Sequence, residues 1–417
     1  MSNDKQASSS QPERRLISSN LQDCLKIIGG RQVQNLQPIN KFNPHIARSI
    51  PNHCLVVPFG LSNSFTAPDL TTSNLSRKGA DGQSGVEGKL CLTDEQWKGL
   101  ALGLTEAARR EFDKVASPSV FEVVQMLTLK IALRVLYDRD PSDTSRDDAI
   151  LTLAKEINAQ WLRSKEPYDP PHPPKWRFKD QESLVSALST IFPDFKPDDP
   201  ETNPLNALIP CYETVWRVSL RCFLELTSRD HPAGQAWCTV VKSFVARPEM
   251  DVFLARAQGV HVTSPEDIAR EALRLYSPTR RIYRTYKDAD GNQVLAAADI
   301  EALHREAEHW GEDALIFKPE RMEAKLEGKD EKQIEQEAFL PFASRPFVCP
   351  ARRKNIKGEH LPFGPAIIAL IVGVLVNVTE CVGDGKGGWK FAGGLPTGEL
   401  PLETGREACG ELRFVRH

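Results

Sequence analysis

The chain has 417 residues, a formal net charge of −3, 26% charged residues and 40% hydrophobic residues. These values are ordinary for a globular protein with a sizeable core, and they show no basic surplus that would indicate a nucleic acid as partner. The nine cysteines form neither CxxC pairs nor His/Cys clusters, which argues against a zinc site and a disulfide framework and indicates a reducing compartment.

The N-terminal end is polar. Its first 15 residues include few side chains that could be buried in a core, as is typical of disordered segments. We therefore expect a disordered tail over residues 1–17, followed by one domain over residues 18–417.

Helical periodicity dominates the rest of the chain. Thr93 and Ser264 stand where N-caps are expected, with acidic residues in the turn that follows. Pro210 should interrupt one helix, because proline removes a backbone hydrogen bond. Helices are expected over residues 94–115, 117–137, 147–163, 205–226 and 265–275.

Strand-like segments are short. A run of prolines makes residues 165–178 a loop, and glycines make residues 383–398 a turn region. Together these patterns predict a fold that is mostly α with small β-sheets. Strands are expected over residues 49–57, 282–286, 293–296 and 411–415.

The most apolar run covers residues 362–376. It is short for a membrane span and predicts a buried core helix. No signal peptide or membrane anchor is visible, so we expect a soluble, cytoplasmic protein.

Cys349 is the first candidate for chemistry. It lies shortly before the apolar run, in the stretch Phe-Leu-Pro-Phe-Ala-Ser-Arg-Pro-Phe-Val-Cys-Pro-Ala-Arg-Arg. A thiolate near the start of a helix is stabilised by the helix dipole and by backbone N–H groups. The alternative is a core cysteine, the usual state of a lone intracellular cysteine.

A second candidate is the pair Glu271 and Arg274, which lie on one face of a helix because they are three residues apart. By itself this pattern fits a surface salt bridge worth less than about 1 kcal/mol. Further along the chain, Phe-Lys-Pro-Glu-Arg ends at Arg321, a second arginine that would join the pair.

In this order, Glu-Ala-Leu-Arg, Phe-Lys-Pro-Glu-Arg and the Cys349 loop resemble the cytochrome P450 family of haem-thiolate enzymes. The resemblance is strong from about residue 205 onward and weak before it. It implies a cytochrome P450-like fold with a single haem domain, in which Cys349 binds the iron of haem b and Phe342 packs near the sulfur. Glu271, Arg274 and Arg321 would form a buried network that braces the haem loop.

The haem loop departs from the family's pattern. Four residues before the cysteine the family has glycine, where this chain has Arg345, and two before it Arg or His, where this chain has Phe347. Arg345 is expected to take over the lost contact with a haem propionate. The alternative is a different backbone course, because a non-glycine residue disfavours positive φ.

Three other residues are expected to contact the cofactor by the same resemblance. Arg281 and Arg284 follow the Glu-Ala-Leu-Arg helix at about the place of a propionate arginine in the family. Trp97 lies in a segment similar to the family's Trp-x-x-x-Arg motif, although the arginine is missing. The alternative for the two arginines is a solvated surface position.

Glu213 and Thr214 match the acid and threonine of the family's central helix, while Pro210 and Cys211 replace its pair of small residues. The resemblance implies that Glu213 and Thr214 relay protons during oxygen activation. The alternative is a polar pair on a buried helix, with Thr214 bonded back to a carbonyl.

The resemblance is closest to atypical, soluble fungal members that act in secondary metabolism. It implies an oxidoreductase, a monooxygenase that oxidises a small apolar substrate with O₂ and with electrons from NADPH through a separate flavoprotein reductase. Phe59 and Phe65 lie where the family has a pocket-lining loop. The surface of the endoplasmic reticulum is an alternative location.

Two alternatives for function stay open. The first is a haem-thiolate enzyme that catalyses a peroxide-driven oxidation, a coupling, a dehydration or a rearrangement. The second is a non-catalytic carrier of haem or of another ligand.

Overall fold

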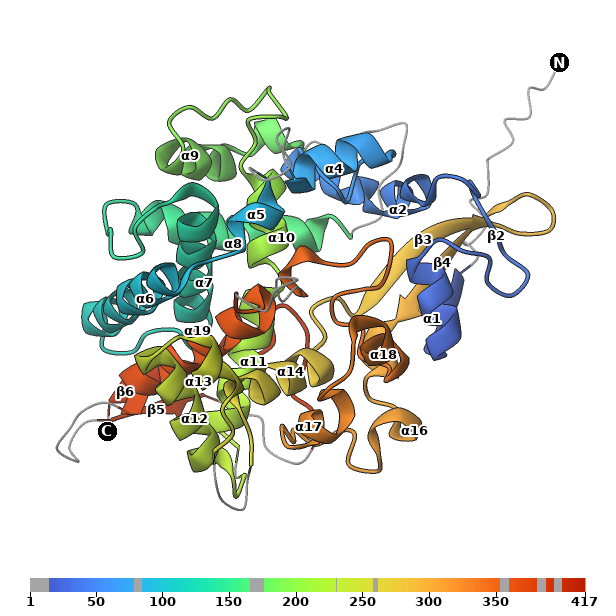
Figure 1. Ribbon diagram of the computed structural model, residues 1–417. Helices are drawn as coiled ribbons and strands as arrows, with labels where there is room; N and C mark the ends of the chain where they lie inside the picture. The colour runs from blue at the N-terminus through green and yellow to red at the C-terminus, as the bar shows by residue number, and fades with distance from the viewer. Residues whose placement is uncertain are drawn as a thin grey trace.

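The computed structural model describes residues 15–78, 85–165, 176–229, 231–257, 262–352, 360–380, 388–393 and 400–416. Helices make up most of it, and a small sheet lies beside the helical body (Figure 1). The expected class, mostly α with small β-sheets, is confirmed. The first strand begins at Arg15, three residues before the expected start of the domain.

Helices occur along the whole length of the described chain. Those of the first half are α1 (Leu21–Ile28), α2 (Pro44–Asn52), α3 (Val56–Phe59), α4 (Leu70–Lys78), α5 (Val86–Lys89), α6 (Asp94–Lys114), α7 (Val120–Tyr137), α8 (Asp147–Arg163) and α9 (Glu182–Ile191). Those of the second half are α10 (Leu205–Tyr212), α11 (Val215–Thr227), α12 (Gly234–Ala246), α13 (Met250–Leu254), α14 (Pro265–Leu275), α15 (Ile300–Leu303), α16 (Ala307–Trp310), α17 (Arg321–Leu326), α18 (Glu331–Gln336) and α19 (Phe363–Glu380). Short 3₁₀ helices cover His53–Leu55, Phe178–Asp180 and Pro350–Arg352.

The larger sheet has the strand order β1-β4-β3-β2, with β1 at Arg15–Ser18, β2 at Gln37–Pro38, β3 at Arg281–Lys287 and β4 at Gln293–Asp299. Strands β3 and β4 form an antiparallel hairpin, and β1 runs parallel to β4. A second, two-stranded sheet joins β5 (Trp389–Ala392) to β6 (Arg413–Arg416).

Helix α19 forms the centre of the helical core, as the apolar run predicts. It packs against α6, α11, α12 and α14. A Cβ on Gly373 would lie 2.5 Å from the Val241 carbonyl oxygen of α12, so the two helices approach as closely as glycine allows. By length and hydropathy α19 would also pass as a membrane span, but 89% of that window is buried inside the protein, as in a core helix.

Helix ends with clear capping signals are where the sequence predicts them. Helix α6 begins after Thr93 and α14 after Ser264, each with a complete capping box.

The strand expected over residues 49–57 is wrong, because this stretch forms α2, a 3₁₀ turn and α3. Asn43 caps α2 and Pro44 occupies its first position, and these start signals outweigh the β-branched residues that follow. The proline-rich loop and the glycine-rich turn lie largely outside the described residues.

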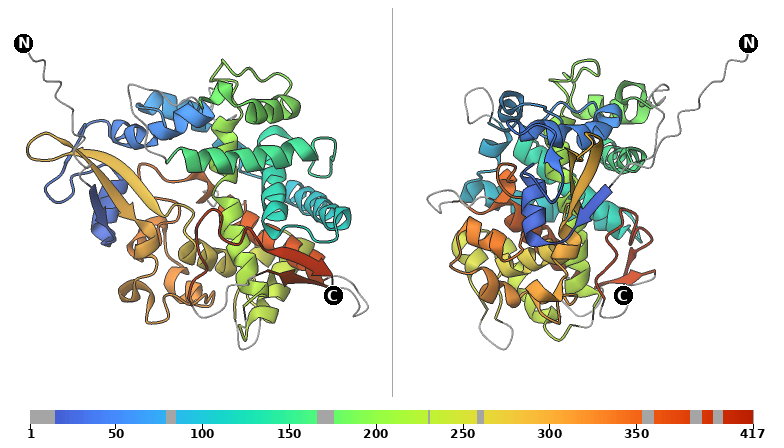
Figure 2. Two further views of the ribbon diagram at one scale, coloured as in Figure 1. Left: turned by 180° about the vertical axis from the view of Figure 1, so that it is seen from behind. Right: turned by 90° about the vertical axis from the view of Figure 1, so that its right-hand side faces the viewer.

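The central helix is broken where Pro210 predicts a disturbance. Helices α10 and α11 follow one another through the middle of the molecule (Figures 1 and 2), with Glu213 and Thr214 in the break. Pro210 cannot donate to the Asn206 carbonyl, and the Asn63 side-chain amide donates to that oxygen instead, at 3.0 Å. The loop around Asn63 is therefore fastened to α10 by the carbonyl that the proline leaves free.

Candidate functional site

Cys349 lies between α18 and α19 in a loop held closely against the core. Its N–H donates to the Phe342 carbonyl at 2.9 Å, and Phe342 is buried. A Cβ on Gly364, near the start of α19, would meet the Phe342 ring at 2.9 Å and the Ala351 carbonyl at 3.1 Å. Gly364 thus permits the close approach of the Cys349 loop to the core helix.

Cys349 is half-buried. Desolvation raises the pKa of its thiol, while the backbone N–H of Ala351 and the cations Arg77 and Arg48 lower it. Burial, and then the nearness of Cys349, raises the pKa of Cys211 to about 12. Cys211, near the end of α10, and Cys349 both pack against the main hydrophobic core. Among the described residues, no group of three or more His, Cys, Asp or Glu could hold a metal ion.

Two buried arginines lie beside this loop. Arg48 of α2 and Arg284 of β3 are 8% and 3% exposed, and each guanidinium lies over the Phe347 ring at 4.8 Å. Arg284 donates to the Tyr283 carbonyl at 2.7 Å, while its Nε has no partner among the described residues. Neither arginine forms an ion pair with a carboxylate in the described part of the chain.

Two further groups, an arginine and a histidine whose pKa burial and then Arg48 lower, complete this cluster, which we call the cationic cluster after its arginines. Arg77 of α4 pairs with Glu87 and donates to the Val348 carbonyl at 3.2 Å. His45 of α2 is buried with its ring 5.0 Å from that of Phe347, and its Nδ1 lacks a partner among the described residues. Sequence analysis missed Arg48, His45 and Arg77.

The cationic cluster contains fewer carboxylates than arginines among the described residues. Burial, and then the neighbouring Arg284 and Arg77, holds the pKa of Arg48 well below its ordinary value, and burial lowers the pKa of Arg284 to about 10. Buried cations without counter-charges are costly, so an anionic ligand would relieve this cost. A haem bound through Cys349, with carboxylates at its edge, fits the donor set of this site.

Arg284 was expected to reach the cofactor, and it lies beside the Cys349 loop. Arg281, three residues away on the same strand, must face the other side of the sheet, and it pairs with Asp299 at 2.7 Å in a partly exposed position. Arg345 is exposed and makes no ion pair or side-chain hydrogen bond to a described residue. The expected cofactor contacts of Arg281 and Arg345 thus find no support in their positions.

Trp97 is buried on α6, with its ring 6.1 Å from that of Phe363 at the start of α19. Its indole nitrogen has no hydrogen-bond partner among the described residues. Any hydrogen-bond acceptor for the Trp97 indole N–H must therefore lie outside the described residues.

Glu213 is buried, and its carboxylate lies next to two arginine side chains. It forms an ion pair with Arg406 and lies 3.4 Å from Arg217. Arg406 also donates to the Asn158 side chain at 3.2 Å and lies 4.5 Å from the centre of the Trp161 ring. Glu213 therefore joins the helix break to α8 and to the C-terminal segment, a contact that sequence analysis did not predict.

Thr214 is the N-cap residue of α11 and is half-buried. Its hydroxyl makes no hydrogen bond to a described residue, so the alternative in which it bonds back to a carbonyl is wrong. The hydroxyl remains available to a ligand or a water.

Glu271 and Arg274 form a completely buried, bidentate ion pair, with both N–O distances 2.7 Å. Arg321 approaches the same carboxylate at 3.2 Å. Arg274 also donates to the carbonyls of His304 and Ala314, at 2.6 and 2.8 Å. The surface salt bridge considered from the sequence is therefore wrong, and the three residues come together as a buried network.

His304 links this network to the segment that leads into the Cys349 loop. Its Nδ1 donates to the Arg274 carbonyl at 3.0 Å, and its Nε2 accepts from the Leu340 N–H at 2.9 Å. Since Nε2 accepts, the ring is neutral. Burial, and then the Arg274 charge, lowers the pKa of His304 to about 3.

The His304 pKa predicts acid sensitivity. A folded-state pKa below the ordinary 6.5 means that the neutral ring contributes its full stability above about pH 6.5 and loses it as the pH falls toward 3. Urea midpoints should fall more steeply over this range in the wild type than in His304→Gln, whose amide oxygen can still accept from Leu340. His309→Gln, at a partly exposed histidine, should keep the wild-type slope, and equal slopes in all three proteins would contradict the assignment.

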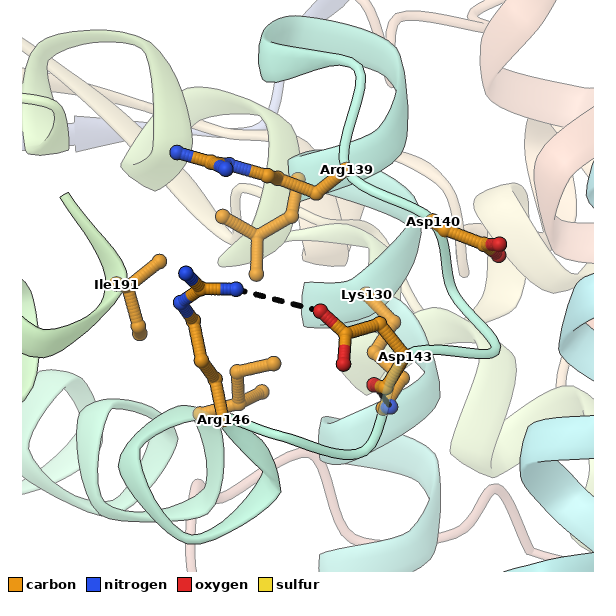
Figure 3. Close-up of a pocket in the computed structure, with 8 residues that line it drawn as sticks. Lys130, Arg139, Asp140, Asp143, Arg146 and Ile191 are labelled. Atoms are coloured by element: carbon orange, nitrogen blue, oxygen red, sulfur yellow. Dashed lines mark hydrogen bonds and ion pairs between the residues drawn. The ribbon is translucent and has the colours of Figure 1, made fainter.

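A pocket shown in Figure 3 lies elsewhere, where α7, α8 and α9 meet. Several of its charges have partners: Arg146 pairs with Asp143 at 3.2 Å, and Lys130 donates to the carbonyls of Pro141 and Asp143. It shares no residue with the cationic cluster, so nothing links it to Cys349.

Comparisons with known proteins find local similarity. The chain is 35% identical over 105 residues to a protein named cytochrome P450 CYP13A3 from Caenorhabditis elegans, 36% over 89 residues to cytochrome P450 CYP72A616 from Paris polyphylla, and 33% over 112 residues to cytochrome P450 734A5 from Oryza sativa subsp. japonica. These matches cover 23%, 20% and 25% of this chain and 19%, 17% and 19% of the relatives, so the chain spans less than a fifth of their length. No protein-family model matches the chain.

Among solved structures, a six-coordinated cytochrome P450 from Thermus thermophilus aligns with 87% of this chain and 91% of its own, with a TM-score of 0.48 and 14% identity. That score is too low to establish a shared fold. The sequence relatives support the cytochrome P450 family as the source of the resemblance. They come from a nematode and two plants, and they give no support to the expected fungal origin or to a role in secondary metabolism.

Proposed function

We propose that this chain is a haem-thiolate oxidoreductase of the cytochrome P450 family, with Cys349 as the protein ligand of the haem iron. The observation that carries the proposal is the nearness of the half-buried Cys349 to buried arginines that lack carboxylate partners among the described residues. A haem supplies both missing parts, a metal for the thiolate and carboxylates for the cations. The relatives named as cytochromes P450 support the same assignment.

Within this proposal, the chain is a monooxygenase that acts on a small apolar substrate. Bound haem would supply oxygen activation assisted by the thiolate, and a separate flavoprotein reductase would supply electrons from NADPH. Thr214, with its free hydroxyl in the helix break, is positioned to hold a water or donate a proton. Glu213 would join the relay only by leaving Arg406 and Arg217.

The direct test is reduction of the purified protein under carbon monoxide, followed by turnover with and without NADPH and a reductase. A thiolate-type carbon monoxide band together with NADPH-dependent oxidation supports the monooxygenase. Lack of bound haem in protein expressed with ample haem would contradict the proposal as a whole.

The ion pairs of Glu213 favour a second candidate. A carboxylate held by two arginines is poorly placed to shuttle protons, and the small pair before it is replaced by Pro210 and Cys211. A haem-thiolate enzyme that uses peroxide, or that couples, dehydrates or rearranges its substrate, would need no such shuttle. Turnover without NADPH and reductase would select this candidate.

Thr214→Ala is expected to keep haem binding and substrate affinity while slowing product formation by about two to four orders of magnitude, the usual contribution of general acid–base assistance. More hydrogen peroxide should be released per NADPH consumed. Thr227→Ala is the matched control, because Thr227 also lies on α11 but bonds back to the Phe223 carbonyl at 2.7 Å. Wild-type rate and coupling in Thr214→Ala would remove Thr214 from the relay and favour the second candidate.

A further inference from the structure

Three asparagine side chains join the loop after α3 to the start of α10, and we call them the asparagine clasp: Asn63, Asn203 and Asn206. The Asn203 amide donates to the carbonyls of Phe59 and Gly60, at 2.7 and 3.1 Å. The Asn63 amide donates to the Asn206 carbonyl at 3.0 Å, and the Asn206 side-chain oxygen accepts the Ser62 N–H at 2.8 Å. These bonds fasten a loop near the N-terminus to a helix of the second half of the chain.

Asn63 and Asn203 use both the donor and the acceptor of the amide group. The Asn63 oxygen accepts the Phe65 N–H at 3.0 Å, and the Asn203 oxygen accepts the Leu205 N–H at 3.0 Å. Both side chains are buried, with exposed fractions of 1% and 3%. Replacing either one with an apolar residue would therefore leave buried N–H and C=O groups without their partners, which is costly.

Pro210 leaves the Asn206 carbonyl open to the loop. Proline has no backbone N–H, so the carbonyl four residues before it receives no donor from position 210. The Glu213 N–H donates to the Ile209 carbonyl at 3.0 Å, so the regular helical bonding is present again just beyond the proline. The Asn63 amide thus replaces the helical donor that Pro210 removes.

The loop side of the clasp reaches the Cys349 loop. The Phe65 N–H bonds to Asn63, and the Phe65 ring lies 4.5 Å from the Arg48 guanidinium. Arg48 in turn lies 4.8 Å from the ring centre of Phe347, which belongs to the Cys349 loop. A displacement of the loop after α3 would therefore change the packing beside Cys349.

The helix side of the clasp reaches Thr214. Thr214 follows Asn206 by about 12 Å along the helix axis, at a rise of about 1.5 Å per residue. Glu213 and Thr214 keep helical backbone angles, with φ and ψ of −60° and −34° and of −88° and −37°. Because the backbone stays helical across the break, a movement of α10 is transmitted to Thr214 and on to α11.

We propose that the asparagine clasp couples the loop over residues 60–67 to the helix break, so that an apolar ligand which displaces this loop also moves Thr214. Asn63 is then a positioning residue that acts through the loop and through α10, and Pro210 makes its anchor on α10 available. This inference rests on the proposed function, in which Thr214 holds a water or donates a proton. Ligand binding would thus adjust the position of the Thr214 hydroxyl.

The first test is hydrogen exchange of the purified full-length protein, followed by mass spectrometry in peptides that cover residues 60–67 and 203–212. Asn63→Leu should raise exchange in both peptides about tenfold or more, because buried hydrogen bonds are lost on each side of the clasp. Asn292→Leu is the matched control, since the Asn292 amide donates to Asp288 in an exposed turn, and it should leave both peptides unchanged. Faster exchange in residues 60–67 alone would overturn the proposal.

A milder variant covers the case in which Asn63→Leu folds poorly. Asn206→Ala removes the acceptor of the Ser62 N–H at a half-buried position, but it keeps the backbone carbonyl to which Asn63 donates. It should raise exchange in the same two peptides by a smaller factor. Unchanged exchange in either peptide would contradict the clasp.

Pro210→Ala tests the origin of the anchor. The new N–H at position 210 can donate to the Asn206 carbonyl, so this carbonyl keeps a donor when Asn63 is replaced. Asn63→Leu should therefore raise exchange in residues 203–212 less in the Pro210→Ala background than in the wild type. Equal increases in the two backgrounds would contradict the role given to Pro210.

The last test adds a ligand to the haem-loaded protein. Phenylimidazole is the probe, because its nitrogen binds haem iron and its apolar ring occupies the space beside the iron. Saturation of the wild type should change exchange in both peptides, whereas in Asn63→Leu the change should stay within residues 60–67. A haem-loaded wild type in which residues 203–212 keep their exchange rate would refute this inference alone, whereas protein that takes up no haem refutes the proposed function.

Discussion

Cys349→Ala is expected to abolish the red-shifted band of the reduced carbon monoxide complex that marks a thiolate-bound haem. The physical reason is local: Cys349 lies in a loop closed by its own hydrogen bond to Phe342 and fitted against α19 at Gly364. No other described cysteine lies in that loop. Cys349→His should move the band to the position typical of an imidazole ligand.

Cys211 provides the control for this prediction. Like Cys349, it is half-buried and packs against the main hydrophobic core, so it serves as the alternative ligand to test. Cys211→Ser should leave the thiolate-type band in place. Loss of the band in Cys211→Ser, with retention in Cys349→Ala, would transfer the ligand to α10 and overturn the assignment of the Cys349 loop.

The sequence predicts the fold best where local signals act alone. Helices α6 and α14 begin at their capping boxes, and the strands expected over residues 282–286 and 293–296 lie within β3 and β4. Residues 49–57 carry conflicting signals, and the β-branched residues led to the wrong element. A strand over residues 49–57 leaves no helix α2, so the sequence gives no reason to expect Arg48 at the site.

The site was predictable only in the parts that follow sequence order. Cys349, Glu271, Arg274 and Arg321 belong to motifs with a recognisable order, and the structure brings the last three together. The partners of Glu213 were not predictable, because Arg406 lies far along the chain and no local pattern marks it. Arg281 and Arg284 could have been separated from the sequence by the two-residue period of a strand.

The buried network of Glu271, Arg274 and Arg321 leads to the second large prediction. Arg274→Ala should lower the free energy of unfolding by about 3 to 5 kcal/mol, because it removes the bidentate cation of the buried Glu271 and leaves Arg321 and the Lys318 N–H as its described partners. A loss of this size is a large part of the total stability of a typical domain. It should appear as a lower urea midpoint, followed by circular dichroism, and as a lower haem content after purification.

A surface ion pair offers the matched control. Arg247 and Asp251 are joined on one exposed turn, with side chains 56% and 67% exposed. Arg247→Ala removes an arginine of the same charge and should change the free energy of unfolding by less than about 1 kcal/mol. If Arg274→Ala unfolds at the same urea concentration as Arg247→Ala, the buried network contributes nothing beyond a surface pair.

The order of effects within the network is a sharper test than their size. Glu271→Ala leaves two buried cations facing each other and should be the most damaging change. Arg321→Ala should be the mildest, because Arg321 also pairs with the partly exposed Asp313, and Glu271 keeps its bidentate partner. Each loss should also reach the Cys349 loop, since Arg274 holds His304 and His304 holds Leu340. Haem content should therefore fall in the same order as stability, and a variant that loses stability while keeping full haem content would separate the network from the loop it is proposed to brace.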